Sequence, residues 1–175
     1  MGITRAASVL AAVSLLAEPA AAACGDEPRL HALDFWLGTW SVQSNGETVG
    51  TDVVESILDG CAILERWTDA GGGKGLSLFW FDARKDAWQQ VWVTDDALQP
   101  FGTKQKSEVR EFTTQSRIRF AGRHAGNTPG REVLDRTTLT RLESGALHQR
   151  IEISDDDGQT WKTVFDAAYL PPGSP

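Results

Sequence analysis

The sequence predicts an all-β fold, a single antiparallel up-and-down barrel of about ten strands. From Phe35 onward the chain consists of short runs rich in Val, Ile, Thr, Trp and Phe. Clusters of Gly, Asn and Asp separate these runs at intervals that suit antiparallel hairpins. No stretch between them has helical length, apart from a single expected turn at residues 29–35. Roughly 150 residues remain after the N-terminal segment, which is enough for one hydrophobic core.

Residues 1–23 have the order of a secretory signal peptide. Arg5 supplies a positive charge, residues 6–16 are apolar, and small residues lead up to Ala23. The apolar run is shorter than the roughly 20 residues that cross a bilayer, and Pro19 disfavours the alternative of a surface helix. We therefore expect a signal peptide at residues 1–23 and one barrel domain at residues 24–175, periplasmic or secreted.

Two cysteines, Cys24 and Cys61, remain after the predicted cleavage. An even pair in an exported protein favours a disulfide. The alternative is a lipid anchor on Cys24, although Ala21 stands where a lipoprotein signal usually has a larger aliphatic residue. Catalysis by Cys61 is disfavoured because no nearby residue supplies a base.

Strands are expected wherever β-branched and aromatic residues gather between turn signals such as Asn45-Gly46, Ser144-Gly145 and Asp157-Gly158. The predicted strands, in chain order, are 39–43, 51–58, 62–68, 76–81, 88–94, 98–104, 108–113, 117–121, 132–142, 147–154 and 160–169.

Alternation along the strands places aromatic and polar side chains on shared faces. Such a mixture suits a ligand pocket, but alternation alone also allows a solvent-facing surface. The candidate ligand-binding residues are Glu65, Trp67, Ser77, Gln90 and Trp92, with Arg136 as a possible anchor. Glu65 is also the weak catalytic candidate, alone or paired with Glu152, since burial beside Trp67 would raise its pKa. The alternative is that Glu65 is paired with an arginine.

The segment at residues 33–40 contains a Gly-x-Trp motif, Gly38 and Trp40. It resembles the opening of lipocalin-like (calycin) barrels, in which such a tryptophan closes the base and stacks on a late arginine, here Arg136, Arg141 or Arg150. With the segments 60–61, 65–67, 75–77, 88–93 and 154–161, it is similar to exported bacterial proteins of unknown function related to the DUF1579 group. The resemblance implies a calycin-like barrel and no known reaction.

The residues Ser154, Asp156, Gly158, Thr160 and Trp161 match the Asp-box pattern. The aspartate of this motif ties the amides of a hairpin turn, and its glycine takes the left-handed conformation. The motif occurs once, without the repeats of a propeller, so we expect a structural role.

Composition excludes several functions. A formal net charge of −7, with basic residues scattered, disfavours nucleic-acid binding. The three histidines, His31, His124 and His148, are far apart in the sequence and predict neither a metal site nor a cofactor. Only His148 is a candidate haem ligand, and it is expected to be exposed.

The leading hypothesis is that the barrel interior binds a small, partly apolar ligand. The alternatives are an enzyme, an isomerase or hydrolase that uses Glu65 as acid or base, and an envelope interaction protein with no small-molecule ligand. The sequence indicates no oligomeric state.

Overall fold

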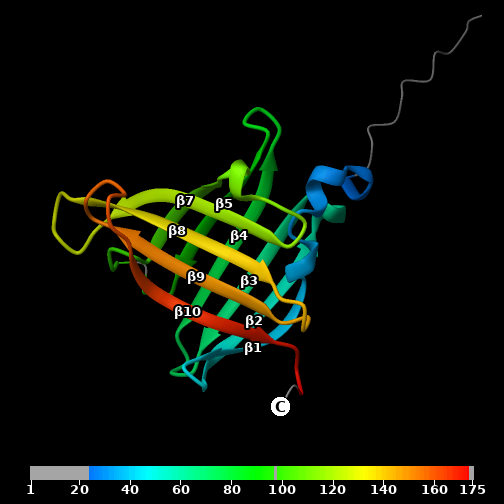
Figure 1. Cartoon of the computed structure of the whole chain (residues 1–175), viewed down its shortest axis with the longest axis horizontal. Helices are drawn as coiled ribbons and strands as arrows, with labels where there is room; N and C mark the ends of the chain where they lie inside the picture. The colour runs from blue at the N-terminus through cyan, green and yellow to red at the C-terminus, as the bar shows by residue number, and fades with distance from the viewer. Residues whose placement is uncertain (1–23, 97, 174–175) are drawn as a thin grey trace, which may run out of the picture.

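A computed structural model of the chain describes residues 24–96 and 98–173; the predicted signal peptide lies outside the described residues. Ten antiparallel strands form a closed barrel in which each strand pairs with its neighbours in sequence and β1 pairs with β10. Figure 1 shows β7 to β10 crossing in front of the strands of the other wall. The predicted all-β, up-and-down barrel is confirmed.

The strands alternate in direction and are joined by short connections. Their bounds are β1 Gly38–Ser44, β2 Glu47–Ile57, β3 Ala62–Asp69, β4 Lys74–Asp82, β5 Ala87–Thr94, β6 Thr103–Glu108, β7 Arg117–Ala125, β8 Glu132–Arg141, β9 Leu147–Ser154 and β10 Lys162–Leu170. Five short 3₁₀ helices accompany them: η1 Cys24–Asp26, η2 Pro28–His31, η3 Asp34–Trp36, η4 Leu58–Gly60 and η5 Arg110–Phe112.

The two expected strands at 98–104 and 108–113 are wrong, because a single strand, β6 Thr103–Glu108, replaces them and overlaps only their adjoining ends. Pro100 has no amide hydrogen to donate to a ladder. Successive turns fold the preceding segment, with the amide of Gln99 donating to Asp96 and that of Gly102 to Gln99. After β6, η5 turns Phe112 under the Arg119 guanidinium, 4.1 Å from its ring centre.

The N-terminal helices close one end of the barrel, as Figure 1 shows beside the ends of β2 and β3. Leu33 and Trp36 are completely buried, and the Trp36 ring meets Phe79 edge to face at 5.3 Å between ring centres. The Trp88 indole N–H donates to the Arg29 carbonyl at 3.0 Å. Burial of these side chains and of the facing Phe120 makes an apolar plug, called here the closed end.

A disulfide joins Cys24 to Cys61 across 37 positions of sequence. It fastens η1 to the segment that follows η4, immediately before β3. The plug is therefore covalently attached to the barrel wall. A disulfide fits an oxidising compartment, as the sequence predicted.

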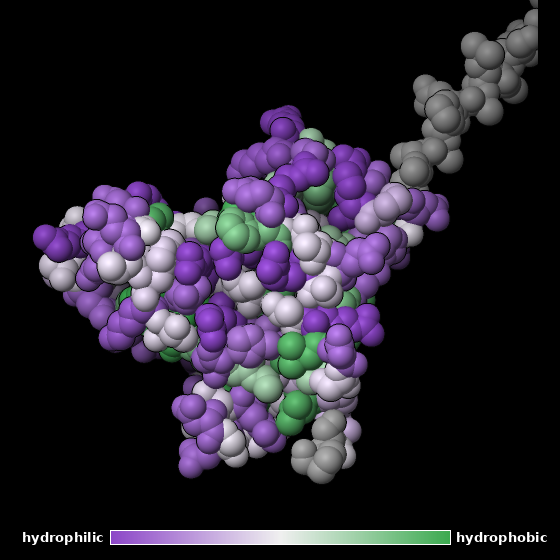
Figure 2. Space-filling model, in the orientation of Figure 1, coloured by the Kyte–Doolittle hydropathy of each residue, from purple (hydrophilic) through white to green (hydrophobic). Residues whose placement is uncertain are grey.

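The outer surface in the view of Figure 2 is mostly hydrophilic, with small separate hydrophobic patches. Within the described part of the chain, none of the helices has the length and apolar character needed to cross a membrane.

Candidate functional site

A cavity of about 180 Å³ lies inside the barrel, on the side away from the closed end. Six strands contribute to its lining, each through inward side chains. The lining residues are Glu65, Trp67, Gln90, Trp92, Lys104, Lys106, Thr137, Gln149, Ile151, Phe165 and Tyr169. By comparison, an engineered cavity of about 150 Å³ holds benzene, so this cavity has room for one six-membered ring with a small substituent.

The apolar side of the cavity is formed by Trp67 and Trp92 with Phe165 and Ile151. Both indoles lie over glycines: a Cβ on Gly50 would be 2.5 Å from Trp67, and one on Gly75 would be 2.1 Å from Trp92. Real Cβ atoms do not approach other atoms so closely, and only glycine leaves space for these ring positions. The glycines therefore let both rings lie against the wall and leave the cavity open.

The cationic side of the cavity is formed by Lys104 and Lys106, which alternate along β6. The ammonium group of Lys104 is 2.9 Å from Oδ2 of Asp135, and that of Lys106 contacts Oδ1 of the same carboxylate. Lys106 also donates to the Thr137 hydroxyl at 2.6 Å, and His124 lies 3.0 Å from Asp135. Two lysines thus share one buried carboxylate.

The charged states of this cluster follow from burial and pairing. Burial opposes ionisation of Asp135, but the hydrogen bond with His124 and the charges of Lys106 and Lys104 outweigh it and lower its pKa. Burial lowers the pKa of Lys106 to about 8, against the opposing charge of Asp135. Asp135 is therefore ionised at neutral pH, and Lys106 loses its proton more readily than an ordinary lysine.

Two carboxyl groups, Asp52 and Glu65, lie on the inner face of β2 and β3. Burial, with the nearby Glu65, raises the pKa of Asp52 to about 9. Burial raises the pKa of Glu65 to about 7, although the Ser77 hydroxyl and the charge of Lys106 favour its ionised form. Neither Asp52 oxygen has a hydrogen-bond partner among the described residues. At pH 7, Asp52 is thus protonated, and Glu65 holds its proton more strongly than an ordinary glutamate.

Amide and hydroxyl groups complete the polar side. The Gln90 amide donates to the Ser77 hydroxyl at 3.1 Å, while its own oxygen has no partner within the described ranges. The Tyr169 hydroxyl donates to the Gln149 oxygen at 2.6 Å. Gln90 therefore presents an acceptor, and Gln149 an amide N–H₂, to whatever occupies the cavity.

Four of the six candidate ligand-binding residues line the cavity: Glu65, Trp67, Gln90 and Trp92. Ser77 is fully buried behind them and supports Gln90. Arg136 lies on the outer face and does not reach the cavity, because Asp135 and Thr137, its neighbours on β8, take the inward positions. The suggested interior anchor is therefore wrong.

Arg136 instead packs on a different tryptophan from the one expected. Its guanidinium lies 3.8 Å from the Trp161 ring centre, and its Nε donates to Glu152 at 2.7 Å. Trp40 is buried, and its indole N–H donates to the Trp36 carbonyl at 2.9 Å.

Glu152 also faces outward and cannot pair with Glu65 across the cavity. The arginine partner suggested for Glu65 is not found among the described residues either, since Lys106 is the cation that acts on it.

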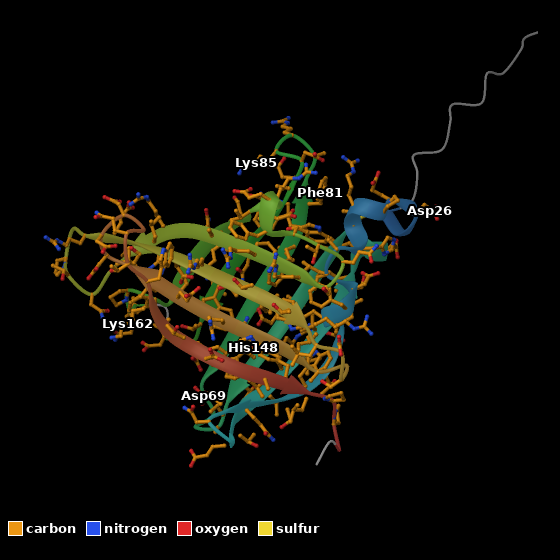
Figure 3. All side chains as sticks on the ribbon, in the orientation of Figure 1. Asp26, Asp69, Phe81, Lys85, His148 and Lys162 are labelled. Atoms are coloured by element: carbon orange, nitrogen blue, oxygen red, sulfur yellow. A yellow bond between two sulfur atoms is a disulfide. The ribbon has the colours of Figure 1, made fainter. Side chains whose placement is uncertain are left out.

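The three histidines lie in separate places. His31 is exposed, 2.6 Å from Asp34. His148 lies on the outer face, as Figure 3 shows on the front wall, with its Nε2 2.6 Å from Asp166. Only His124 faces the interior. Among residues 24–96 and 98–173, no cluster of three or more His, Cys, Asp or Glu side chains is placed to hold a metal ion.

The Asp-box segment connects β9 to β10. Asp156 accepts from the Ser154 hydroxyl and from the amide and hydroxyl of Thr160, at 2.6–2.9 Å. Gly158 has a φ of +87°, and its carbonyl accepts from the Trp161 indole at 3.1 Å. The opening motif is also irregular: Gly38 has a φ of +142° as the chain enters β1. These residues belong to the frame of the barrel and not to the cavity.

Sequence reasoning missed most of the polar and charged residues in and behind the cavity wall. Lys104 and Lys106 alternate in the pattern of inward residues, but the wrong strand bounds at 98–104 separated them. Asp52, Asp135 and Gln149 resemble ordinary solvent-facing residues in the sequence. The available signal was their spacing of two from apolar inward residues such as Val54 and Leu147.

Fold and site together define a closed up-and-down β-barrel with a partly polar internal cavity, which is consistent with a lipocalin-like barrel. No protein-family model matches the sequence, and no curated protein is significantly similar to it.

Proposed function

We propose that the protein binds a small, partly apolar molecule inside the barrel. The observation that carries this proposal is the division of one cavity inside the barrel into an aromatic side, with Trp67, Trp92 and Phe165, and a polar side, with Glu65 and Lys106. Ligand sites combine apolar walls with a few directed polar groups in this way. The volume of about 180 Å³ favours a ligand with a single ring.

One polar group of the lining supports binding over a role as plain core. The oxygen of Gln90, a residue that lines the cavity, lacks a partner among the described residues. A buried polar group without a partner costs about 1–3 kcal/mol. A ligand that donates a hydrogen bond to Gln90 would recover part of this cost, whereas apolar packing would not.

Calorimetric titration with benzyl alcohol tests the proposal. Ile151→Trp should fill much of the cavity and abolish the binding measured for the unchanged protein. Val164→Trp is the matched control, because Val164 is 48% exposed on β10, and it should bind normally. The proposal would be refuted if benzyl alcohol, benzamide and benzoate all failed to bind the folded protein. It would also be refuted if they bound equally well to folded Ile151→Trp.

A second candidate function is acid-base catalysis by Glu65. The favouring observation is a cavity-lining carboxyl group whose pKa burial raises to about 7, which suits proton transfer near neutral pH. Mass spectrometry of a metabolite extract incubated with the protein should then show a product that the Glu65→Gln protein does not form. Identical products with folded Glu65→Gln would contradict this function.

We also propose that the protein acts outside the cytoplasm, as an exported relative of the proteins that its sequence resembles. The Cys24–Cys61 disulfide and the leader-like residues 1–23 support this proposal. Expression of the full chain in a Gram-negative host should give a periplasmic protein whose N-terminus is Cys24. A protein found in the membrane fraction with a lipid on Cys24 would favour the alternative anchor, and a cytoplasmic protein that keeps residue 1 would contradict export.

A further inference from the structure

The charges around the cavity do not balance when Glu65 is protonated. Lys104 and Lys106 contribute two positive charges, and the one carboxylate they share, Asp135, contributes a single negative charge. His124 contacts Asp135 and adds no negative charge. While both lysines are protonated, the charge on Glu65 decides, within the described part of the chain, whether this cluster is neutral or carries an excess positive charge.

The two ammonium groups retain hydrogen-bonding capacity toward the cavity. An ammonium group has three N–H donors. Lys106 donates to Thr137 and forms an ion pair with Asp135, and Lys104 donates to Asp135, so each ammonium group keeps at least one N–H without a partner among the described residues. Both side chains line the cavity while being at most 14% exposed. A ligand oxygen placed between them would find directed donors in a site shielded from bulk water.

Glu65 is surrounded by groups that control its proton. Asp52 on β2 and Tyr169 on β10 face it as acids, and Lys106 on β6 faces it as a cation. Lys104, Asp135 and His124 form the rest of the charged cluster. The Ser77 hydroxyl and the charge of Lys106 stabilise a negative charge on Glu65, so another anion near Lys106 competes with Glu65 for that ammonium group.

We propose that the cavity selects single-ring molecules with one carboxylate group, held by Lys104 and Lys106 in place of the negative charge of Glu65. The inference rests on the proposed function, because it assigns the head group of the ligand in the same cavity. The ring lies against Trp67 and Trp92, and the carboxylate points toward β6. Binding is accompanied by uptake of a proton on Glu65, which restores the charge balance.

The experiment compares benzoate with benzamide and benzylamine by calorimetry between pH 6 and pH 8. Benzoate should bind at least tenfold more tightly than benzamide at pH 6, and benzylamine should bind most weakly. Benzoate affinity should fall by up to tenfold per pH unit above pH 7, because one proton is taken up on binding. Benzamide affinity should stay nearly constant over this range.

Two substitutions separate the parts of this inference. Glu65→Gln should flatten the pH dependence of benzoate binding between pH 6 and pH 7.5 and strengthen it at the upper end. Lys104→Met should remove the preference for benzoate over benzamide. Lys85→Met is the control, because Lys85 lies on the β4–β5 hairpin, which Arg29 contacts at the closed end, and it should change neither.

The outcomes distinguish this inference from the proposed function. Equal or tighter binding of benzamide or benzylamine overturns the carboxylate preference and leaves the cavity as a ligand site. Pronounced pH dependence of benzoate binding between pH 6 and pH 7.5 in folded Glu65→Gln overturns the proton exchange. If none of the three probes binds and benzyl alcohol also fails, the proposed function falls with the inference.

Discussion

Asp52 and Glu65 are carboxyl groups placed where water cannot solvate their charges. Asp52 is fully buried, and the pKa values of both groups are raised by that burial. For each group, the folded state holds its proton over a pH range in which the unfolded chain releases it. Stability is therefore greatest below about pH 4 with respect to these groups and decreases as pH rises toward the folded pKa values of about 7 and about 9.

Asp52→Asn should remove the larger part of this pH dependence. Between pH 5 and pH 8, the free energy of unfolding of the variant relative to the unchanged protein should increase by about 1.4 kcal/mol per pH unit, as expected for one proton. Urea unfolding at several pH values measures the difference. A constant difference across this range would mean that Asp52 is ionised in the folded protein. Asp166→Asn, on the outer face beside His148, is the control.

Adjacent strands hold the cavity open through the two glycines beneath the indoles. Gly75→Ala places a Cβ at 2.1 Å from the Trp92 ring, which must then move toward the cavity. We expect at least a tenfold loss of benzyl alcohol affinity in a folded protein. Gly25→Ala is the matched control, because its Cβ would meet no atom within 4 Å. Unchanged affinity in folded Gly75→Ala would show that this close approach does not shape the cavity.

The disulfide that attaches η1 to the barrel wall should stabilise the closed end and the folded protein. Closing a loop of 37 positions is worth about 4 kcal/mol in the chain-entropy model. A variant with both Cys24→Ser and Cys61→Ser should lose about 2–4 kcal/mol of unfolding free energy. A reducing agent should destabilise the unchanged protein to a similar extent and leave the double variant unaffected. Equal stability of all forms would show that the disulfide does not hold the plug.

For the strands and turns, the sequence predicts where hairpins occur better than it predicts which side chains point into the barrel. Turn pairs such as Asn45-Gly46 and Asp157-Gly158 mark the ends of strands because few residues take left-handed angles. The same local signals fail around Pro100, where turns replace a strand. Arg136 and Asp135 differ by one position and lie on opposite sides of the wall. Only closure of the barrel determines which of them is inside.

Barrel closure creates the site, because no single hairpin contains it. Glu65, Lys106 and Gln149 come from strands that are distant in sequence, and they meet only when β1 pairs with β10. Four lining residues could be predicted because aromatic and polar residues alternate on β3 and β5. The inward positions of Lys104 and Lys106 on β6 and of Asp135 on β8 could not be predicted, since charged residues in a strand usually face water.

The interior cavity is proposed to bind a small molecule, and its two tryptophans can report that binding. The most direct measurement follows the indole N–H signals of the seven tryptophans by NMR during titration with benzoate at pH 6. We expect saturable shifts for Trp67 and Trp92, which line the cavity, and none for Trp80, which is 37% exposed. Unchanged Trp67 and Trp92 signals at saturating benzoate, and again with benzyl alcohol, would contradict the claim.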